Sequence, residues 1–183
     1  MHEQPPQSPV SFPVQVARLP QKGLAVTIEA DPAQRAALAA EHGLSSVAAW
    51  RAELAAKPWK LNGVKVAGRV RAEIVQACVV TLEPLEAHID EAVEGLFLPQ
   101  DSKLGRVGFD RAGEIVLDAD GPDGPETFSG DSIDVGALAE QFFALAVDPY
   151  PRKPGAALDN PGEETGQDES EFRQKLRSLF GKS

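Results

Sequence analysis

The dipeptide Asn62-Gly63 lies between two segments of extended character and is the strongest turn signal in this chain. Asn and Gly accept the backbone conformation that a tight hairpin turn requires. After this turn, small or apolar side chains occupy most alternate positions from Val64 to Cys78, and charged side chains lie between several of them. A period of two places each set on one face of a strand. The chain is therefore constrained to form a long antiparallel hairpin with one buried face and one solvated face.

The sequence predicts the strands after this turn more clearly than the strand before it. The second arm contains Gly68, which predicts a bulge or a bend at its middle. The first arm does not alternate cleanly over 47–53, so the sequence leaves its register open. Residues 81–84 read Thr-Leu-Glu-Pro and predict a second turn, after which the alternation resumes over 85–97. This third strand is expected to pair with the second.

Short strands are predicted near both ends of the domain. Apolar residues recur at every second position in 12–16 and again in 24–28, on either side of a turn-like sequence at 20–23. This pattern predicts two short strands joined as a hairpin. A further short strand is expected at 114–119, before a turn rich in Gly and Pro.

Two segments have helical character. Segment 32–42 is rich in alanine, follows Asp31 as a good N-cap, begins with proline and ends before a glycine. In segment 133–147 the apolar spacing changes from two to three and four, with Asp134 as the cap and Pro149 beyond the end. Both segments are predicted to pack as helices against the sheet.

With 183 residues, 42% of them hydrophobic, the chain is long enough for one ordinary core with tails. The predicted fold class is α+β: a strongly curved antiparallel sheet, open or closed into a small barrel, with two packed helices and a flexible acidic C-terminal tail. The predicted organisation is a flexible arm (1–9), the α+β domain (10–156), an acidic disordered linker (157–169) and a short amphipathic helix (170–183). That last helix either docks on the domain or binds a partner.

The formal net charge is -10, and the acidic residues are concentrated in 101–134 and 159–171. Because Lys and Arg supply most of the non-specific affinity for nucleic acids, this balance argues against broad RNA or DNA binding, while a local basic site stays open. The sequence contains no secretion signal and no apolar stretch long enough to span a membrane, so we expect a cytoplasmic protein without membrane association.

The candidate chemistry of the chain is limited. Cys78, the only cysteine, would need a neighbouring base to act as a nucleophile, and only His2, His42 and His88 are available. We therefore interpret Cys78 as a small buried group that ends a strand. One cysteine and three scattered histidines give no zinc-ligand spacing, and the acidic turn at 118–124 does not fit a calcium-loop pattern. No catalytic residue, metal, cofactor or small-molecule substrate is predicted.

A proline-rich strap at 148–155 is the main candidate for partner binding. It holds Tyr150 beside Arg152 and Lys153. These side chains either present an aromatic face and two cations to an acidic protein or a phosphate backbone, or pack the end of the preceding helix while the cations stay solvated. A second candidate is a basic patch on the predicted strand, formed by Lys65, Arg69 and Arg71.

Three stretches are similar to one protein family: VAGRVRAEIVQACVVTLEP at 66–84, FLP at 97–99 and IDVGALAEQFFALAVDPYPRKPGA at 133–156. They resemble the YceD-like family, also called the large ribosomal RNA subunit accumulation protein family, in its alphaproteobacterial form, over residues 10–156. The resemblance implies a role in the accumulation of large-subunit ribosomal RNA, hence in ribosome assembly, with no established enzymatic activity. Many members have a second cysteine where this chain has Thr81, so no role of a cysteine pair carries over. The positions that match the family motifs are Cys78, Thr81, Leu82, Glu83, Pro84, Glu140, Asp148, Pro149, Tyr150, Pro151 and Arg152.

The charge balance and the resemblance together favour a protein that binds a basic ribosomal protein or assembly factor and keeps this cationic partner from premature contact with RNA. The alternative is an RNA-binding module with a local basic patch, in which several phosphate contacts would make the affinity fall steeply with salt. The residues of that patch are Lys65, Arg69, Arg71, Arg152 and Lys153.

Overall fold

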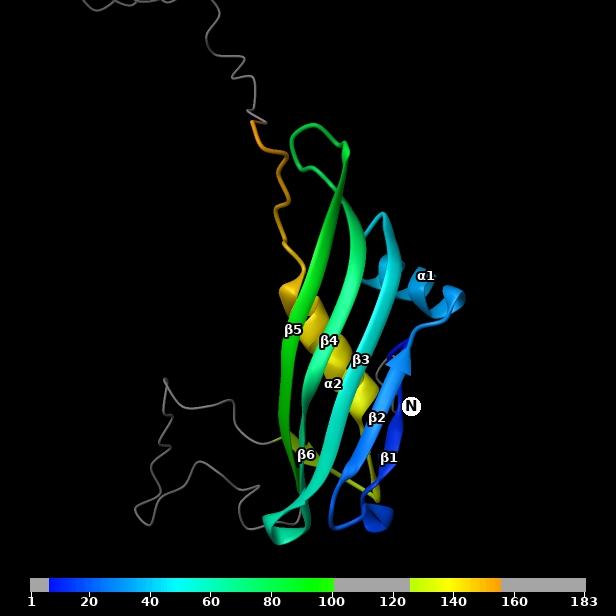
Figure 1. The fold of residues 1–183 in the computed structure, drawn as a ribbon, viewed down its shortest axis with the longest axis vertical. Helices are drawn as coiled ribbons and strands as arrows, with labels where there is room; N and C mark the ends of the chain where they lie inside the picture. Colours follow the sequence, from blue (N-terminus) through cyan, green and yellow to red (C-terminus); the bar gives the residue numbers. More distant parts are fainter. Residues whose placement is uncertain (1–6, 101–125, 156–183) are drawn as a thin grey trace, which may run out of the picture.

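The computed structural model describes residues 7–100 and 126–155. Its main sheet has five strands in the order β2-β3-β4-β5-β6 (Figure 1). Neighbouring strands from β2 to β5 are antiparallel, and β6 runs parallel to the end of β5. The strands are β2 (Leu24–Glu29), β3 (Ser46–Trp59), β4 (Gly63–Ala77), β5 (Pro84–Pro99) and β6 (Glu126–Phe128).

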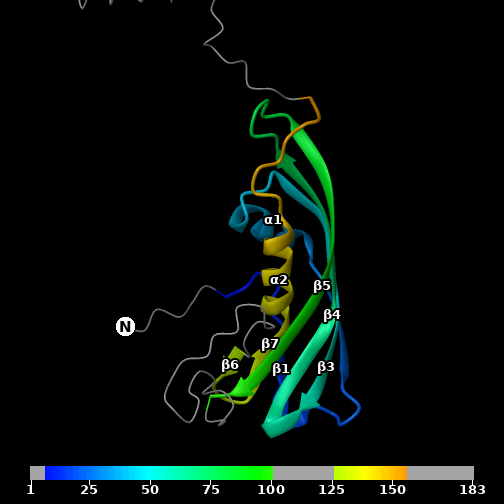
Figure 2. The ribbon, with the colours of Figure 1, turned by 90° about the vertical axis from the view of Figure 1, so that its left-hand side faces the viewer.

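The presence of two helices beside a mostly antiparallel sheet confirms the predicted α+β class. The sheet is open, so the alternative of a closed barrel is wrong. Within the described part of the chain, β2 and β6 are the two outer strands and do not pair with each other. Closure would require the outer strands to meet along their lengths. Here β6 has three residues, and helix α2 lies across the face of the sheet that would have been the interior of a barrel (Figure 2).

The predicted hairpin between 12–16 and 24–28 is wrong. Residues Val16–Arg18 form a short 3-10 turn, and β1 (Pro13–Gln15) pairs with β7 (Ser132–Asp134) in a separate two-stranded sheet. The carboxylate of Asp134 accepts hydrogen bonds from the Ser11 hydroxyl and from the backbone N–H of Phe12, the latter at 2.8 Å. These contacts between residues far apart in sequence, rather than the local turn, determine the strand with which β1 pairs.

The predicted turn at Asn62-Gly63 is confirmed. Asn62 has a φ of 58° at the end of a 3-10 turn that joins β3 to β4. The bulge predicted at Gly68 is wrong, because the register shifts between Val47 and Ala49 instead. This shift explains why the first arm does not alternate cleanly in sequence.

Gly68 has a different role, which is to let two strands approach closely. A Cβ at this position would lie 2.0 Å from the carbonyl oxygen of Glu53 on β3. Real Cβ atoms do not reach such distances, so β3 and β4 pair as they do because this side chain is absent.

Both predicted helices are confirmed, together with their caps. In α1 (Pro32–Glu41), the Asp31 carboxylate accepts from the backbone N–H of Gln34 at 2.8 Å, and the Gln34 side chain accepts from the backbone N–H of Asp31. In α2 (Val135–Ala146), Asp134 accepts from the backbone N–H of Ala137 at 2.9 Å. Neither helix is long and apolar enough to cross a membrane.

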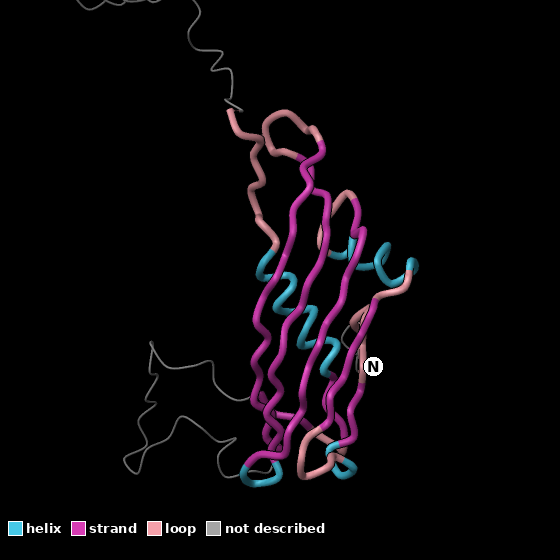
Figure 3. The backbone as a smooth tube through the Cα atoms, in the orientation of Figure 1, coloured by secondary structure: helices cyan, strands magenta, loops and turns pink. Residues whose placement is uncertain are grey.

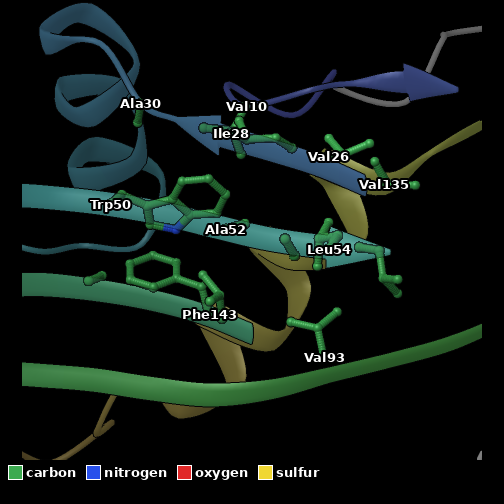
Figure 4. Packing of buried hydrophobic residues seen from close by; sticks show 14 of the residues in the cluster. Val10, Val26, Ile28, Ala30, Trp50, Ala52, Leu54, Val93, Val135 and Phe143 are labelled. Atoms are coloured by element: carbon green, nitrogen blue, oxygen red, sulfur yellow. The ribbon is translucent and has the colours of Figure 1, made fainter. Parts of the chain in front are cut away.

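The core lies between α2 and one face of the sheet (Figure 4). Phe143 of α2 is fully buried, and its ring meets those of Trp50 and His42 edge to face, with centroids 6.5 and 5.4 Å away. The inward-facing side chains of β4 confirm the predicted alternation. Those buried on this face are Val64, Val66, Val70, Ala72, Ile74 and Gln76.

Several predictions lie outside the described residues: the strand at 114–119, the linker at 157–169 and the helix at 170–183. The first six residues of the predicted arm lie outside as well. At the other end of that arm, the carbonyl oxygen of Pro9 accepts a hydrogen bond from the Gln34 side chain at 3.0 Å.

Candidate functional site

Two segments about 70 residues apart in sequence meet at one end of the molecule. They are the end of β4 with its turn into β5 (76–84) and the strap that follows α2 (148–153), and we call them the hairpin–strap junction (Figure 3). The backbone N–H of Val79 donates to the carbonyl oxygen of Pro151 at 2.9 Å. The side chain of Gln76 donates to the carbonyl oxygen of Asp148 at 2.7 Å. The strap is therefore fixed to the inner face of β4, which is the face that packs against α2.

Cys78 lies at the centre of this junction and is fully buried. Its Sγ accepts hydrogen bonds from the backbone N–H groups of Thr81, at 3.5 Å, and of Lys153, at 3.4 Å. Hydrogen bonding by the side chain of Thr81, and then by these backbone donors, lowers the pKa of the Cys78 thiol to about 6. The sulfur thus connects the turn with the strap as an acceptor.

The position of Cys78 separates it from the histidine that follows it in sequence. His88 is opposite Glu73 in the β4–β5 register and is exposed on the outer face of the sheet. Cys78 is buried on the inner face, the face that carries Gln76. The two side chains therefore lie on opposite faces, and His88 is not placed to act as a base for this thiol.

The turn itself is closed by backbone hydrogen bonds. The N–H of Cys78 donates to the carbonyl oxygen of Glu83, and the N–H of Leu82 donates to the carbonyl oxygen of Cys78, both at 2.9 Å. Leu82 takes up a left-handed backbone with a φ of 60° and has 78% of its surface exposed. A large apolar side chain is therefore held in solvent by a well-bonded turn.

A charged pair ties the strap to the same turn. The Lys153 Nζ lies 2.8 Å from Oε2 of Glu83, and the Thr81 hydroxyl donates to the same carboxylate at 3.2 Å. The hydrogen bond from Lys153 lowers the pKa of Glu83, and the same bond raises the pKa of Lys153. Of the two cations predicted to face a partner, Lys153 is thus engaged within the protein. Tyr150 and Arg152 are exposed, and the exposed fraction of Tyr150 is 71%.

Replacing Cys78 with serine is expected to change how stability depends on pH. The folded thiol has a pKa of about 6, below the value of about 8.5 for a free thiol, so the folded state loses its proton first. The free energy of unfolding of the wild type should therefore rise, relative to the variant, as the pH increases from about 6 to about 8.5. Urea denaturation under reducing conditions at several pH values measures this difference. Parallel profiles for the two proteins would contradict it.

Glu140 matches the family motif but lies apart from the junction, in the core. It is buried on α2, and its Oε1 is 3.0 Å from Nε2 of His42, just beyond the end of α1. This contact joins the two helices. Of the prolines in the motif, Pro84 begins β5, and Pro149 and Pro151 lie in the strap.

The five cations of the predicted RNA-binding patch lie in two separate groups. Lys65, Arg69 and Arg71 are exposed on the outer face of β4, whereas the strap contacts the inner face. Arg69 lies 2.7 Å from the carboxylate of Asp90, and Arg71 lies 3.1 Å from that of Glu53. The hydrogen bond from Arg69 lowers the pKa of Asp90, and the charge of the nearby Arg71 adds a smaller effect in the same direction. The two arginines are therefore paired with carboxylates, apart from Arg152 and Lys153.

Gln76 and His42 are the residues that sequence reasoning missed. Gln76 is a polar side chain at a position where the alternation of β4 predicts burial, and that is the signal that could have identified it as an anchor of the strap. His42 has no such signal, because its contact with Glu140 links residues 98 positions apart. Among the residues that the structure describes, no three His, Cys, Asp or Glu side chains are grouped to hold a metal ion.

Comparison with known proteins gives a match to a protein family. The family model for the large ribosomal RNA subunit accumulation protein YceD matches residues 66–178. This match begins in β4, includes both segments of the hairpin–strap junction, and extends beyond residue 156, where the resemblance was expected to end. Neither the curated proteins nor the solved structures gave a match. Because the family model covers well over half of the chain, this protein belongs to the YceD family of large ribosomal RNA subunit accumulation proteins.

Proposed function

We propose that this protein is a non-enzymatic factor of ribosome biogenesis in the cytoplasm, which supports the accumulation of large-subunit ribosomal RNA by binding a basic ribosomal protein or assembly factor. The description of its family supports the link to ribosomal RNA. The observation that carries the mode of action is the hairpin–strap junction, which presents Leu82 and Tyr150 to solvent on a frame that is hydrogen-bonded within the protein. Exposed apolar and aromatic groups are typical anchors of protein interfaces.

The distribution of charge supports a polypeptide partner. The chain carries a formal net charge of -10, so its overall field attracts cationic proteins and repels polyanions. Three of the cations that would favour RNA, Arg69, Arg71 and Lys153, have carboxylate partners. A bound basic protein would be shielded from premature contact with RNA, because its cations would face carboxylates.

Replacing Leu82 or Tyr150 with alanine is expected to reduce binding of this partner by about tenfold or more, if each side chain anchors the contact. Because both side chains are more than two thirds exposed, the free energy of unfolding should change by only about 0.5 kcal/mol. Large-subunit ribosomal RNA should decrease in cells that contain only the variant. Partner recovery and ribosomal RNA are measured in parallel.

Leu24→Ala is the matched control for these variants. Leu24 is also exposed and apolar, but it begins β2 near the opposite end of the sheet, next to Ala56. This variant should retain partner binding and ribosomal RNA levels. Normal ribosomal RNA in cells that contain Leu82→Ala and Tyr150→Ala would contradict the proposed role of the junction.

Direct RNA binding is the second candidate, and the exposure of Tyr150 next to Arg152 on the strap favours it. An aromatic ring and a guanidinium together can stack on a base and contact a phosphate. Such binding would weaken steeply with salt, in proportion to the number of phosphates contacted. A filter-binding series over salt concentration, with Arg152→Glu as the variant, separates this candidate from the first.

A further inference from the structure

Among the residues that the structure describes, the outer edge of β5 has no neighbouring strand over most of its length. This strand has 16 residues and pairs with β4 along one side. On the other side, within the described ranges, only residues 97–99 are paired, with β6. In Figure 2 this edge faces the viewer, with α2 on one side of it. Within residues 7–100 and 126–155, the segment 84–96 therefore presents an edge without a partner strand.

A free edge directs backbone N–H and C=O groups outward at alternate residues and can accept an additional strand. Such edges are normally protected by charged side chains, and β5 has acidic side chains there. Glu86 and Glu94 are exposed on the outer face of the sheet, and Glu91 is exposed on the inner face, opposite Val70 in the register. Among the residues that are described, these three carboxylates form no ion pair, whereas Asp90 is paired with Arg69.

The charges of this edge decide between two possible occupants. A second copy of the chain would bring like carboxylates together across the new pair of strands, which destabilises cross-strand pairing. A strand with Lys and Arg side chains would instead meet carboxylates on both faces of the sheet. The same charges that prevent self-association thus favour a basic peptide.

We propose that the β5 edge over residues 84–96 binds an extended, Lys- and Arg-rich segment of a protein by strand addition. Backbone hydrogen bonds supply the affinity, and Glu86, Glu91 and Glu94 select for the basic side chains. This inference rests on the proposed function, in which the partner is a basic protein, and specifies the surface that holds it.

The test uses the full chain and a dye-labelled peptide of twelve residues in which Lys and Val alternate. We expect binding in a fluorescence anisotropy titration. Addition of the peptide should slow amide exchange in β5 but not in β2, the strand at the other side of the sheet. A control peptide of the same sequence in which every backbone amide is N-methylated has the same charge but no backbone N–H donors on either edge, so it should bind at least about tenfold more weakly. Equal binding of the two peptides would overturn strand addition.

Matched variants test which carboxylates are involved. Glu91→Gln with Glu94→Gln should weaken binding of the Lys-Val peptide about tenfold. Glu29→Gln with Glu41→Gln changes the net charge by the same amount on β2 and α1, away from this edge, and should leave binding close to that of the wild type. Equal losses in the two double variants, or protection confined to β2, would overturn the assignment. So would a stable dimer in light scattering whose β5 amides are protected without peptide.

Recovery of proteins from cell extract separates this inference from the proposed function. If wild type and the Glu91→Gln, Glu94→Gln variant recover the same basic protein in equal amounts, the edge assignment is overturned while the proposed function stands. If the wild type recovers no basic protein, the proposed function itself is overturned. Reduced recovery by this variant alone supports both.

Discussion

Replacing Gly68 with alanine is expected to lower the free energy of unfolding by about 3 kcal/mol, because the added methyl group has no space. The new Cβ would lie 2.0 Å from the carbonyl oxygen of Glu53 and 2.8 Å from the Cα of Leu54. Both are backbone atoms of β3, so no side-chain rotation can relieve the overlap. The two central strands would have to separate, with loss of the hydrogen bonds between them. Urea denaturation followed by circular dichroism measures the change.

Ala67→Ser is the control for this variant. Ala67 precedes Gly68 on β4 but belongs to the outer face, where it is half-buried. The added hydroxyl should change the free energy of unfolding by about 0.5 kcal/mol or less. If Gly68→Ala were as stable as this control, β3 and β4 would not approach each other as the structure has them.

Replacing Phe143 with alanine is expected to cost about 3 to 5 kcal/mol, the usual range for a buried Phe. Phe143 is fully buried between α2 and the sheet, where its ring contacts those of Trp50 and His42. Its loss leaves a cavity at the contact that holds α2 on the sheet. Since domains of this size have a free energy of unfolding of only about 5 to 15 kcal/mol, this substitution should remove a large fraction of it.

Phe142→Ala provides the comparison for Phe143→Ala. Phe142 is the preceding residue of the same helix and is only partly buried at the margin of the core. Its replacement removes the same atoms and should cost clearly less, which a thermal or urea unfolding curve shows directly. Equal losses at the two positions would mean that α2 does not present Phe143 to the sheet.

Local patterns predicted those elements that local physics determines. The alternation over β4 and β5, the Asn62-Gly63 turn and the caps Asp31 and Asp134 all depend on residues close in sequence, and the structure has each of them. The partner of β1 does not depend on its neighbours. A spacing of two predicts a strand but does not identify the strand with which it pairs, so the pairing of β1 with β7 could not be predicted from that spacing.

The sequence identified residues of the candidate site but did not predict how they are arranged in space. The family motifs identified Cys78 and Glu83 in one stretch and Asp148 and Tyr150 in another. That the strap packs against the inner face of β4 depends on α2, which determines where residue 148 emerges. For the same reason the sequence suggested a free cation at Lys153, whereas Glu83 holds it in the folded chain.

The composition of the complex formed in cells tests the central claim, that the partner is a basic polypeptide. The full chain is recovered from extract at low salt, with and without ribonuclease, and bound protein and RNA are quantified over a salt series. We predict a basic protein in stoichiometric amount that is retained after ribonuclease treatment. RNA retained without such a protein, with an affinity that falls steeply as salt increases, would contradict the account.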